Sequence, residues 1–281
     1  MHTVKATLVL GLACAALSAA SAAPAQGADP KHNAQLAQEW AGIAKLPNLW
    51  EGSWQEVSDL YLFPGPVSYT PAAADYVKHY KPTDDSPMAN CLMPGMPFVM
   101  NQGAMPIKFM PMPGMIALYI ETYAVTRFLH TDGRPVPTEP DPTFLGTSVA
   151  HWEGDTLVVD SRGFVDGTLL QIGALPPRGG AGFSVPIFKP HGPGLRFVER
   201  IHLKDYNTLE IATTIYDDTI FAQPYTSTRV WHRHTGKNAD PQEWVCSDNR
   251  DYYDENSGKL EYNVKDKAIS TGKAPGTSPR Q

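Results

Sequence analysis

The stretch that decides the fold runs from Asp132 to Phe164 and reads DGRPVPTEPDPTFLGTSVAHWEGDTLVVDSRGF. Its second half predicts a β-hairpin, with one strand up to Trp152, a turn at residues 153–155 and a second, β-branched strand at residues 156–160. Polar residues lie at the edges of this hairpin: His151, Glu153, Asp155 and Asp160. These residues either line a site or are solvated turn residues, and the sequence leaves both interpretations open.

Strand patterns continue on the C-terminal side of this hairpin and begin before it. Apolar and polar residues alternate in residues 116–127, 195–203 and 209–215, and a long strand is expected at residues 221–234. Consecutive strands without intervening helices predict a mainly β, antiparallel fold. Its length favours a closed β-barrel or a strongly curved sheet, calycin- or lipocalin-like in general shape.

Two short helices are predicted ahead of the strands. Asp29-Pro30 is a helix start, and the apolar residues that follow it have helical spacing. Thr70-Pro71 starts a second helix, which ends at Tyr80, before Pro82.

The domain organisation follows from these patterns. We expect a signal peptide at residues 1–22, an N-terminal helical and loop segment at 23–87, a β-barrel domain at 88–255 and a flexible tail at 256–281. The Met- and Pro-rich residues 88–115 predict either a strap that packs over the sheet or an adaptable pocket wall.

The N-terminus predicts export to the periplasm or secretion. Lys5 precedes an apolar run at residues 6–20, and Ala20-Ser21-Ala22 is a small-residue cleavage pattern. Lipidation of Cys14 is the alternative use of this segment. No later segment is apolar for long enough to span a membrane. A formal net charge of -6 without a basic stripe makes nucleic acid an unsuitable partner.

Removal of the signal leaves two cysteines, Cys91 and Cys246, in an oxidising compartment. We expect them to form a disulfide, with a metal site as the weaker alternative. Neither cysteine has a CxxC partner or a histidine nearby at zinc spacing.

Glu199 is the most informative single residue, because alternation places it on the same face as Leu195, Phe197, Ile201 and Leu203. A carboxylate on an apolar face must be paired or protonated. If it faces a cavity it is a candidate general acid or base. The alternative is a structural ion pair with Arg127 or Arg229.

A second group of candidates shares one predicted strand face: Tyr119, Glu121, Tyr123 and Arg127. This face is too polar for a dry core, so it meets solvent or lines a wet cavity that holds one small ligand. The catalytic candidates are Glu199, Glu121 and His151. The substrate-binding candidates are Arg127, Tyr119, Tyr123, Trp152 and Phe183.

Several motifs resemble those of a widespread family of exported bacterial proteins. They are the run CLMPGMP from Cys91 to Pro97, the run HWEGDTLVVD from His151 to Asp160, and Val198-Glu199-Arg200. The resemblance extends from about Cys91 to Asn249 and implies a common fold, but it implies little about chemistry. The glycine-rich loop from Arg178 to Pro190 departs from the family pattern and is expected to be mobile, near the barrel mouth.

We therefore expect an exported β-barrel that encloses a small apolar or aromatic molecule. The sequence has no GxSxG, HExxH, P-loop or GxGxxG motif, so the chemistry would be cofactor-independent and metal-free, of the lyase, isomerase or decarboxylase type. The alternatives are a non-catalytic binding or carrier protein, and a cell-envelope module whose loop from Phe183 to Phe188 docks a partner.

Overall fold

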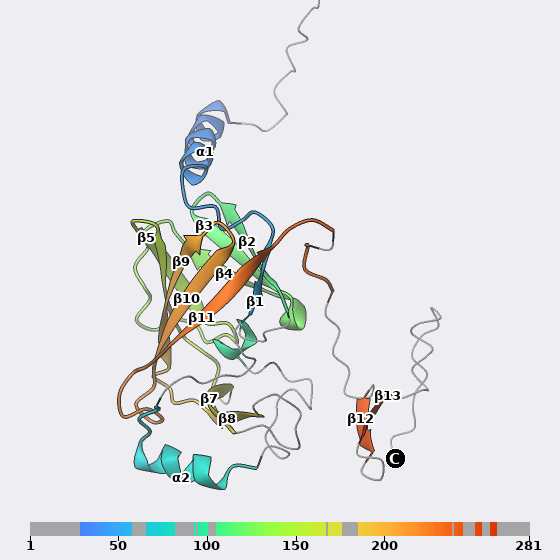
Figure 1. Cartoon of the computed structure of the whole chain (residues 1–281). Helices are drawn as coiled ribbons and strands as arrows, with labels where there is room; N and C mark the ends of the chain where they lie inside the picture. Colours follow the sequence, from blue (N-terminus) through green and yellow to red (C-terminus); the bar gives the residue numbers. More distant parts are fainter. Residues whose placement is uncertain are drawn as a thin grey trace, which may run out of the picture.

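The architecture comes from a computed structural model of the chain (Figure 1). The structure describes residues 29–57, 66–81, 93, 95–100, 105–166, 168–175, 185–237, 239–243, 251–254 and 259–262. The expected signal peptide, Cys91, Cys246 and Phe183 lie outside the described residues. Export, the disulfide and a role for Phe183 therefore stay predictions.

The two predicted helices are confirmed as α1 (Pro30–Ile43) and α2 (Pro71–His79). The Asp29 carboxylate accepts a hydrogen bond from the Lys31 amide at 2.9 Å, and the Thr70 hydroxyl accepts one from the Ala73 amide at 3.3 Å. Each helix also has proline in its first turn, where the missing amide hydrogen costs nothing. Within the described residues, no helix is both long and apolar enough to cross a membrane.

Nine strands form a closed barrel in the order β1-β11-β10-β9-β6-β5-β4-β3-β2, which confirms the expected fold class. Their bounds are β1 (Ser53–Glu56), β2 (Ile107–Met112), β3 (Met115–Ile120), β4 (Val125–His130), β5 (Thr147–Glu153), β6 (Thr156–Arg162), β9 (Arg196–Asp205), β10 (Thr208–Tyr216) and β11 (Tyr225–His234). Neighbouring strands are antiparallel except β4 and β5, which pair in parallel at Leu129–Ser148 and His130–Val149.

Some strands lie where the sequence analysis specified none, and three of them show why. β1 lies within the N-terminal segment, and its four residues are too few to show alternation. β8 (Val185–Pro190) occupies part of the expected loop and pairs with β7 (Leu169–Leu175) outside the barrel. The prolines of β8 are unusual in a strand, which explains why its sequence indicated a loop. β13 (Lys259–Tyr262) lies within the expected tail and pairs with β12 (Asp251–Asp254), which precedes the tail.

The predicted β5–β6 hairpin is present, but Glu153 pairs with Thr156 as the last residue of β5, so the turn holds residues 154 and 155 rather than the expected 153–155. Gly154 has a φ of +65° in the two-residue turn, which glycine adopts without the strain that a Cβ would add. Strand alternation then fixes the two faces of the barrel wall: Leu157, Val159 and Ser161 are buried inside, while Asp160 and Arg162 lie on the outer face.

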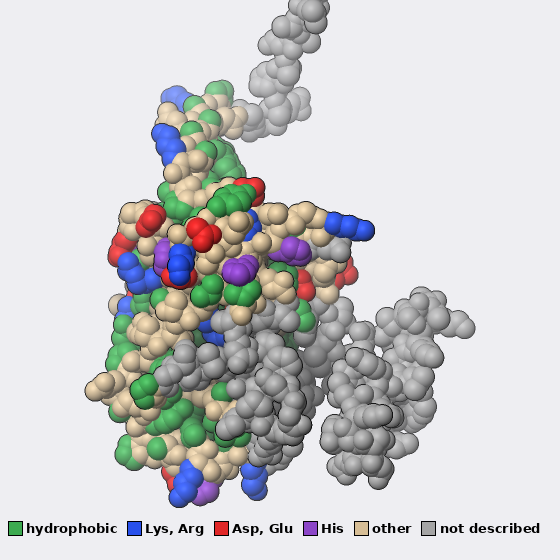
Figure 2. Space-filling model, viewed as in Figure 1, with side chains coloured by type: hydrophobic (Ala, Val, Ile, Leu, Met, Phe, Trp, Pro, Cys, Tyr) green, Lys and Arg blue, Asp and Glu red, His purple; other side chains and the backbone are tan. Residues whose placement is uncertain are grey.

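The core fills the barrel interior. Trp54 from β1 and Trp231 from β11 are both fully buried, and they lie among aliphatic and aromatic side chains of the other strands. The 3-10 helix η2 (Phe98–Met100) adds the buried residues Phe98, Val99 and Met100, and the 3-10 helix η3 (Thr122–Ala124) adds the buried Thr122. The Met- and Pro-rich stretch thus contributes both a barrel strand, β2, and core side chains. By contrast, α1 has no buried residue and projects from the barrel (Figure 2).

Candidate functional site

A buried layer of polar side chains crosses four neighbouring barrel strands, β4, β5, β6 and β9. The Arg127 guanidinium donates to the Glu199 carboxylate at 2.6 Å, to the Ser161 hydroxyl at 2.6 Å and to the Ser148 hydroxyl at 2.9 Å. Its remaining arm contacts the Met100 sulfur at 3.2 Å. Both charged side chains are 1% exposed, so the pair is fully removed from water.

The position of Glu199 is as predicted, and the pairing with Arg127 is one of the two alternatives that the sequence left open. Glu199 points into the barrel because alternation along β9 is unbroken. The guanidinium of Arg127 also lies 5.3 Å from the centroid of the Phe197 ring. These contacts hold the carboxylate in one position, which is typical of a structural ion pair in a core.

The predicted face for Arg127 is wrong. We expected Arg127 to share one strand face with Tyr119, but it lies opposite the buried Leu118 and points inward. The cause is η3, in which Tyr123 and Ala124 have φ angles of +62° and +48°. This turn breaks the alternation between β3 and β4, so counting residues from Ile116 gives the wrong face after Glu121.

Glu121 and Tyr119 both contact one backbone segment near the C-terminal end of the barrel. The Glu121 carboxylate accepts a hydrogen bond from the Gln242 amide at 2.5 Å, and the Tyr119 hydroxyl donates to the Gln242 carbonyl at 3.4 Å. An ion pair between Lys108 and Asp240 holds the same segment. These side chains therefore fasten residues 239–243 to β2 and β3.

The remaining candidates do not assemble with Glu199. His151 lies on the outer wall with its side chain 64% exposed, 3.2 Å from the Glu153 carboxylate. Trp152 and Tyr123 are half-buried and pack against the core. Among the described candidates, the structure therefore places Arg127 and Glu199 in direct contact, and it brings Glu121 and Tyr119 to one backbone segment.

A second buried ion pair lies elsewhere in the barrel. Arg229 of β11 donates to the Glu56 carboxylate of β1 at 2.6 Å, and neither side chain is more than 7% exposed. Arg229 also borders a cavity of about 10 Å³ at one end of the barrel, hereafter the barrel-end cavity. This cavity is lined by Pro97, Phe98, Leu170, Gln171, Thr213, Ile215, Ser227 and Arg229. A volume of this size accommodates about one water molecule.

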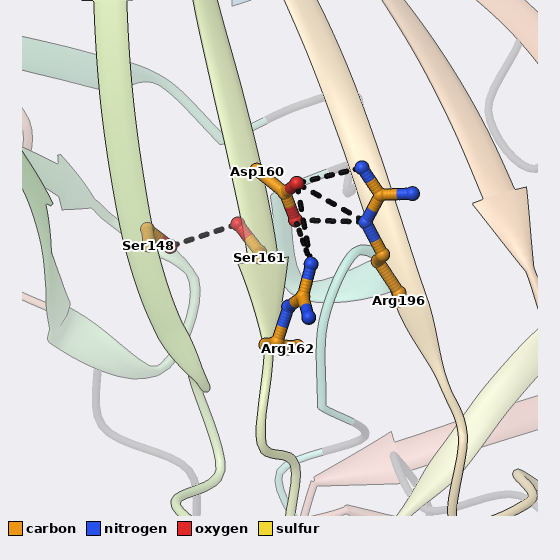
Figure 3. Close-up of polar contacts among 5 residues, drawn as sticks. All are labelled: Ser148, Asp160, Ser161, Arg162 and Arg196. Carbon is orange, nitrogen blue, oxygen red and sulfur yellow. Dashed lines mark hydrogen bonds and ion pairs between the residues drawn. The ribbon is translucent and has the colours of Figure 1, made fainter. Parts of the chain in front are cut away.

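A third polar cluster lies on the outer wall, where two arginines converge on one carboxylate (Figure 3). Arg196 of β9 donates to Asp160 of β6 from Nη2 at 2.6 Å and from Nε at 3.0 Å. Arg162 approaches the same carboxylate at 3.4 Å. Arg196 is held further by the Tyr216 ring, whose centroid lies 5.0 Å from the guanidinium carbon.

This cluster borders a cavity of about 370 Å³, hereafter the outer-wall cavity. Pro140 approaches Gly163 so closely that a Cβ there would lie 2.4 Å from the proline ring, which holds the preceding loop against the end of β6. Phe164 is buried and stacks on Phe197, with the two ring centroids 5.3 Å apart. The lining residues are Thr138, Glu139, Pro140, Pro142, Arg162, Gly163, Phe164, Asp166, Pro193, Gly194, Leu195 and Arg196.

The electrostatics of the cluster favour the ionised carboxylate. Partial burial alone would raise the pKa of Asp160, but the hydrogen bonds and the charge of Arg196 and the nearby Arg162 outweigh burial, so the pKa lies below its ordinary value. The folded state therefore binds a proton at this group less readily than the unfolded state does.

We expect the stability that Asp160 contributes to disappear in acid. A lowered folded pKa gives stability that is fully present above the unfolded value, about 3.9, and is lost as the pH falls through the folded value. The difference in unfolding free energy between wild type and Asp160→Asn should be largest above about pH 5 and shrink below about pH 4. Urea unfolding at each pH measures it.

Asp166→Asn is the control for this experiment. Asp166 lines the same cavity but is exposed, so its replacement should change the unfolding free energy by less than about 0.5 kcal/mol. A difference between wild type and Asp160→Asn that stays constant from neutral to acidic pH would contradict the assignment.

Sequence reasoning identified Asp160 as a polar residue but did not select Arg162 or Arg196. Asp160 and Arg162 are two apart on one strand, so their shared face was readable. The proximity of Arg196 could not be read from the sequence, because β6 and β9 are paired in the sheet but separated in the chain by β7 and β8. Within the described residues, no three His, Cys, Asp or Glu side chains are grouped to hold a metal ion.

Comparison with known proteins does not assign a function to these side-chain clusters. No family model, no curated protein and no solved structure matches the chain.

Proposed function

We propose that this protein is exported and binds a small organic molecule in the outer-wall cavity without transforming it. One observation carries the proposal: two partly enclosed arginines that share a single carboxylate line a cavity of ligand size. At about 370 Å³ it falls within the range of about 300 to 1,000 Å³ that is typical of small-molecule sites. Its lining places apolar side chains, such as Phe164 and Leu195, beside charged groups that could fix the orientation of a ligand.

The barrel interior is a less suitable ligand site. The barrel-end cavity has room for about one water, so an organic ligand would have to displace side chains such as Phe98. Phe98 is buried and packs edge-on against Phe188 at 4.7 Å. The same contact weakens the docking-module alternative, because a buried Phe188 offers no apolar surface to a partner.

A further cavity of about 560 Å³ lies between α1 and the β2–β3 hairpin. Its charged side chains Asp132 and Arg134 bind each other at 2.6 Å and are 36% and 49% exposed. Because these two exposed charges already neutralise each other, a ligand would gain little by pairing with either of them. The arginines of the outer-wall cavity are more enclosed, at 29% and 36% exposed, and share a single partner.

Acid/base catalysis by the predicted residues is the second candidate function, and the geometry favours it less. A catalytic carboxylate must reach a substrate. Glu199 is 1% exposed and bound to Arg127, and Glu121 accepts a hydrogen bond from the Gln242 amide. Neither residue lines any of the three cavities described above.

A ligand screen with a cavity-filling variant tests the proposal. Gly194 lines the outer-wall cavity, and a Cβ at this position would meet nothing within 4 Å. Gly194→Phe should therefore fill the cavity without disturbing the backbone. The matched control is Gly42→Phe on α1, where a Cβ also meets nothing within 4 Å.

We expect at least one compound from a panel of organic acids, amines, sugars and neutral aromatics to raise the melting temperature of wild type and Gly42→Phe but not of Gly194→Phe. At a concentration 100 times Kd a ligand adds about 2.7 kcal/mol, or a shift of about 5 °C or more. Equal shifts in all three proteins, or no shift in wild type, would contradict the proposal.

A further inference from the structure

Two arginines face each other across the outer wall, an arrangement that needs an anion. Arg162 and Arg196 are direct register partners on β6 and β9, with side chains on the same face. Like charges in directly opposed positions destabilise a sheet unless a counter-charge lies between them. The nearest carboxylate, Asp160, supplies one negative charge for two positive ones.

The hydrogen-bonding capacity of the arginines is also incompletely used. A guanidinium has five N–H donors. Arg196 directs Nε and Nη2 at Asp160, whereas Arg162 reaches that carboxylate only through Nη2, at 3.4 and 3.5 Å. The buried Nε of Arg162 has no hydrogen-bond partner among the described residues. Arg162 is therefore weakly held by Asp160, and its terminal nitrogens, rather than the buried Nε, are available to a second acceptor.

We infer that the outer-wall cavity binds a small organic monocarboxylate, whose carboxylate group accepts hydrogen bonds from Arg162 and Arg196. This inference rests on the proposed function and specifies its ligand class. Arginine is suited to the role because each guanidinium has several donors, so Arg196 can keep Asp160 on Nε and Nη2 while Nη1 donates to a ligand. Tyr216 and Asp160 orient the Arg196 guanidinium before a ligand arrives, which reduces the entropic cost of binding.

The other lining residues define the rest of the ligand. Phe164, Leu195 and the prolines offer apolar surface beside the arginines, which fits a compact hydrocarbon or aromatic body. Glu139 and Asp166 also line the cavity and are exposed. They would repel a second anionic group, so monocarboxylates should bind more tightly than dicarboxylates.

Calorimetric titration with matched acids and amides tests the ligand class. The probes are acetate, butyrate, benzoate and phenylacetate, each with its primary amide, together with succinate and inorganic phosphate. We expect at least one monocarboxylate to bind wild type about tenfold or more tightly than its amide, since hydrogen bonds to a charged group are the stronger ones. Succinate and phosphate should bind more weakly than that monocarboxylate.

Two variants test whether Arg162 binds the carboxylate group of the ligand. Arg162→Gln should reduce binding of the acid about tenfold or more and leave binding of the amide unchanged. Because the contacts of Arg162 with Asp160 are long, this variant should fold. Arg200→Gln is the control: it removes an exposed arginine from the outer face of β9, where Arg200 pairs with Glu153, and should leave binding unchanged.

The outcomes separate this inference from the proposed function. If amides bind as tightly as acids, or if phosphate binds as tightly as the best acid, the carboxylate assignment is wrong. If Gly194→Phe still abolishes that binding, the cavity remains the ligand site. Retention of acid binding by Arg162→Gln would also overturn the assignment. If no monocarboxylate binds while neutral or cationic compounds do, the ligand class is wrong and the binding function stands.

Discussion

Replacing Glu199 with glutamine should destabilise the protein by about 3 to 5 kcal/mol. The change keeps the shape of the side chain but removes its charge, which leaves Arg127 as an unpaired cation in the barrel interior. Both side chains are 1% exposed, so water cannot compensate. The other partners of Arg127 are two serines and a methionine, none of which carries charge. Urea unfolding measures the loss.

The outer wall supplies a matched control. Glu153 pairs with Arg200 at 2.8 Å, a separation similar to that of the buried pair, but the two side chains are 48% and 50% exposed. Glu153→Gln should therefore destabilise the protein much less than Glu199→Gln does, because water already screens the exposed pair. If the two substitutions destabilise the protein equally, burial of the Arg127–Glu199 pair is not what stabilises it.

A double replacement separates charge from packing. Arg127→Met combined with Glu199→Leu removes both charges and keeps apolar volume, so it should recover most of the stability that Glu199→Gln loses. Ser148 and Ser161 would still bind each other, since their hydroxyl oxygens lie 2.9 Å apart. A double variant less stable than Glu199→Gln would show that the pair has a role beyond charge neutralisation.

Gly52→Ala should be the second strongly destabilising change, at about 2 to 5 kcal/mol. Gly52 immediately precedes β1 and has a φ of +73°, and a Cβ there would lie 2.4 Å from the backbone oxygen of His234. His234 pairs with Ser53 where β1 meets β11. The carbonyl cannot move away without disturbing this pairing, which helps to close the barrel.

Gly133→Ala measures the cost of a positive φ in alanine without a steric clash. Gly133 has a φ of +78°, but a Cβ there would meet nothing within 4 Å. Its replacement should cost about 1 to 2 kcal/mol, the strain of a left-handed alanine alone. Thermal or urea unfolding of both variants gives the difference, and equal losses would contradict the close contact between β1 and β11.

The sequence predicted those parts of the fold where alternation is continuous. The β5–β6 hairpin and the inward direction of Glu199 follow from unbroken strands whose faces can be counted. The face of Arg127 could not be counted, because η3 interrupts the alternation two residues after Ile120. The choice of Arg127 over Arg229 as the partner depends on strand order, which spacing along one strand does not contain.

The outer-wall cavity illustrates the same limit. The residues of β6 that face it could be read from the sequence, but their pairing with β9 required the structure, since β7 and β8 intervene in the chain. The contact of Pro140 with Gly163 likewise joins a loop to a strand end that no local pattern connects. Local patterns therefore located single side chains, and tertiary pairing assembled them.

The most direct measurement is a crystal structure of the protein with the monocarboxylate that binds most tightly. We expect its carboxylate to lie within hydrogen-bond distance of Arg162 and Arg196, with its apolar body against Phe164 and Leu195. A ligand found instead inside the barrel, beside Arg229 and Gln171, would contradict the assignment of the outer-wall cavity and return the binding site to the barrel interior.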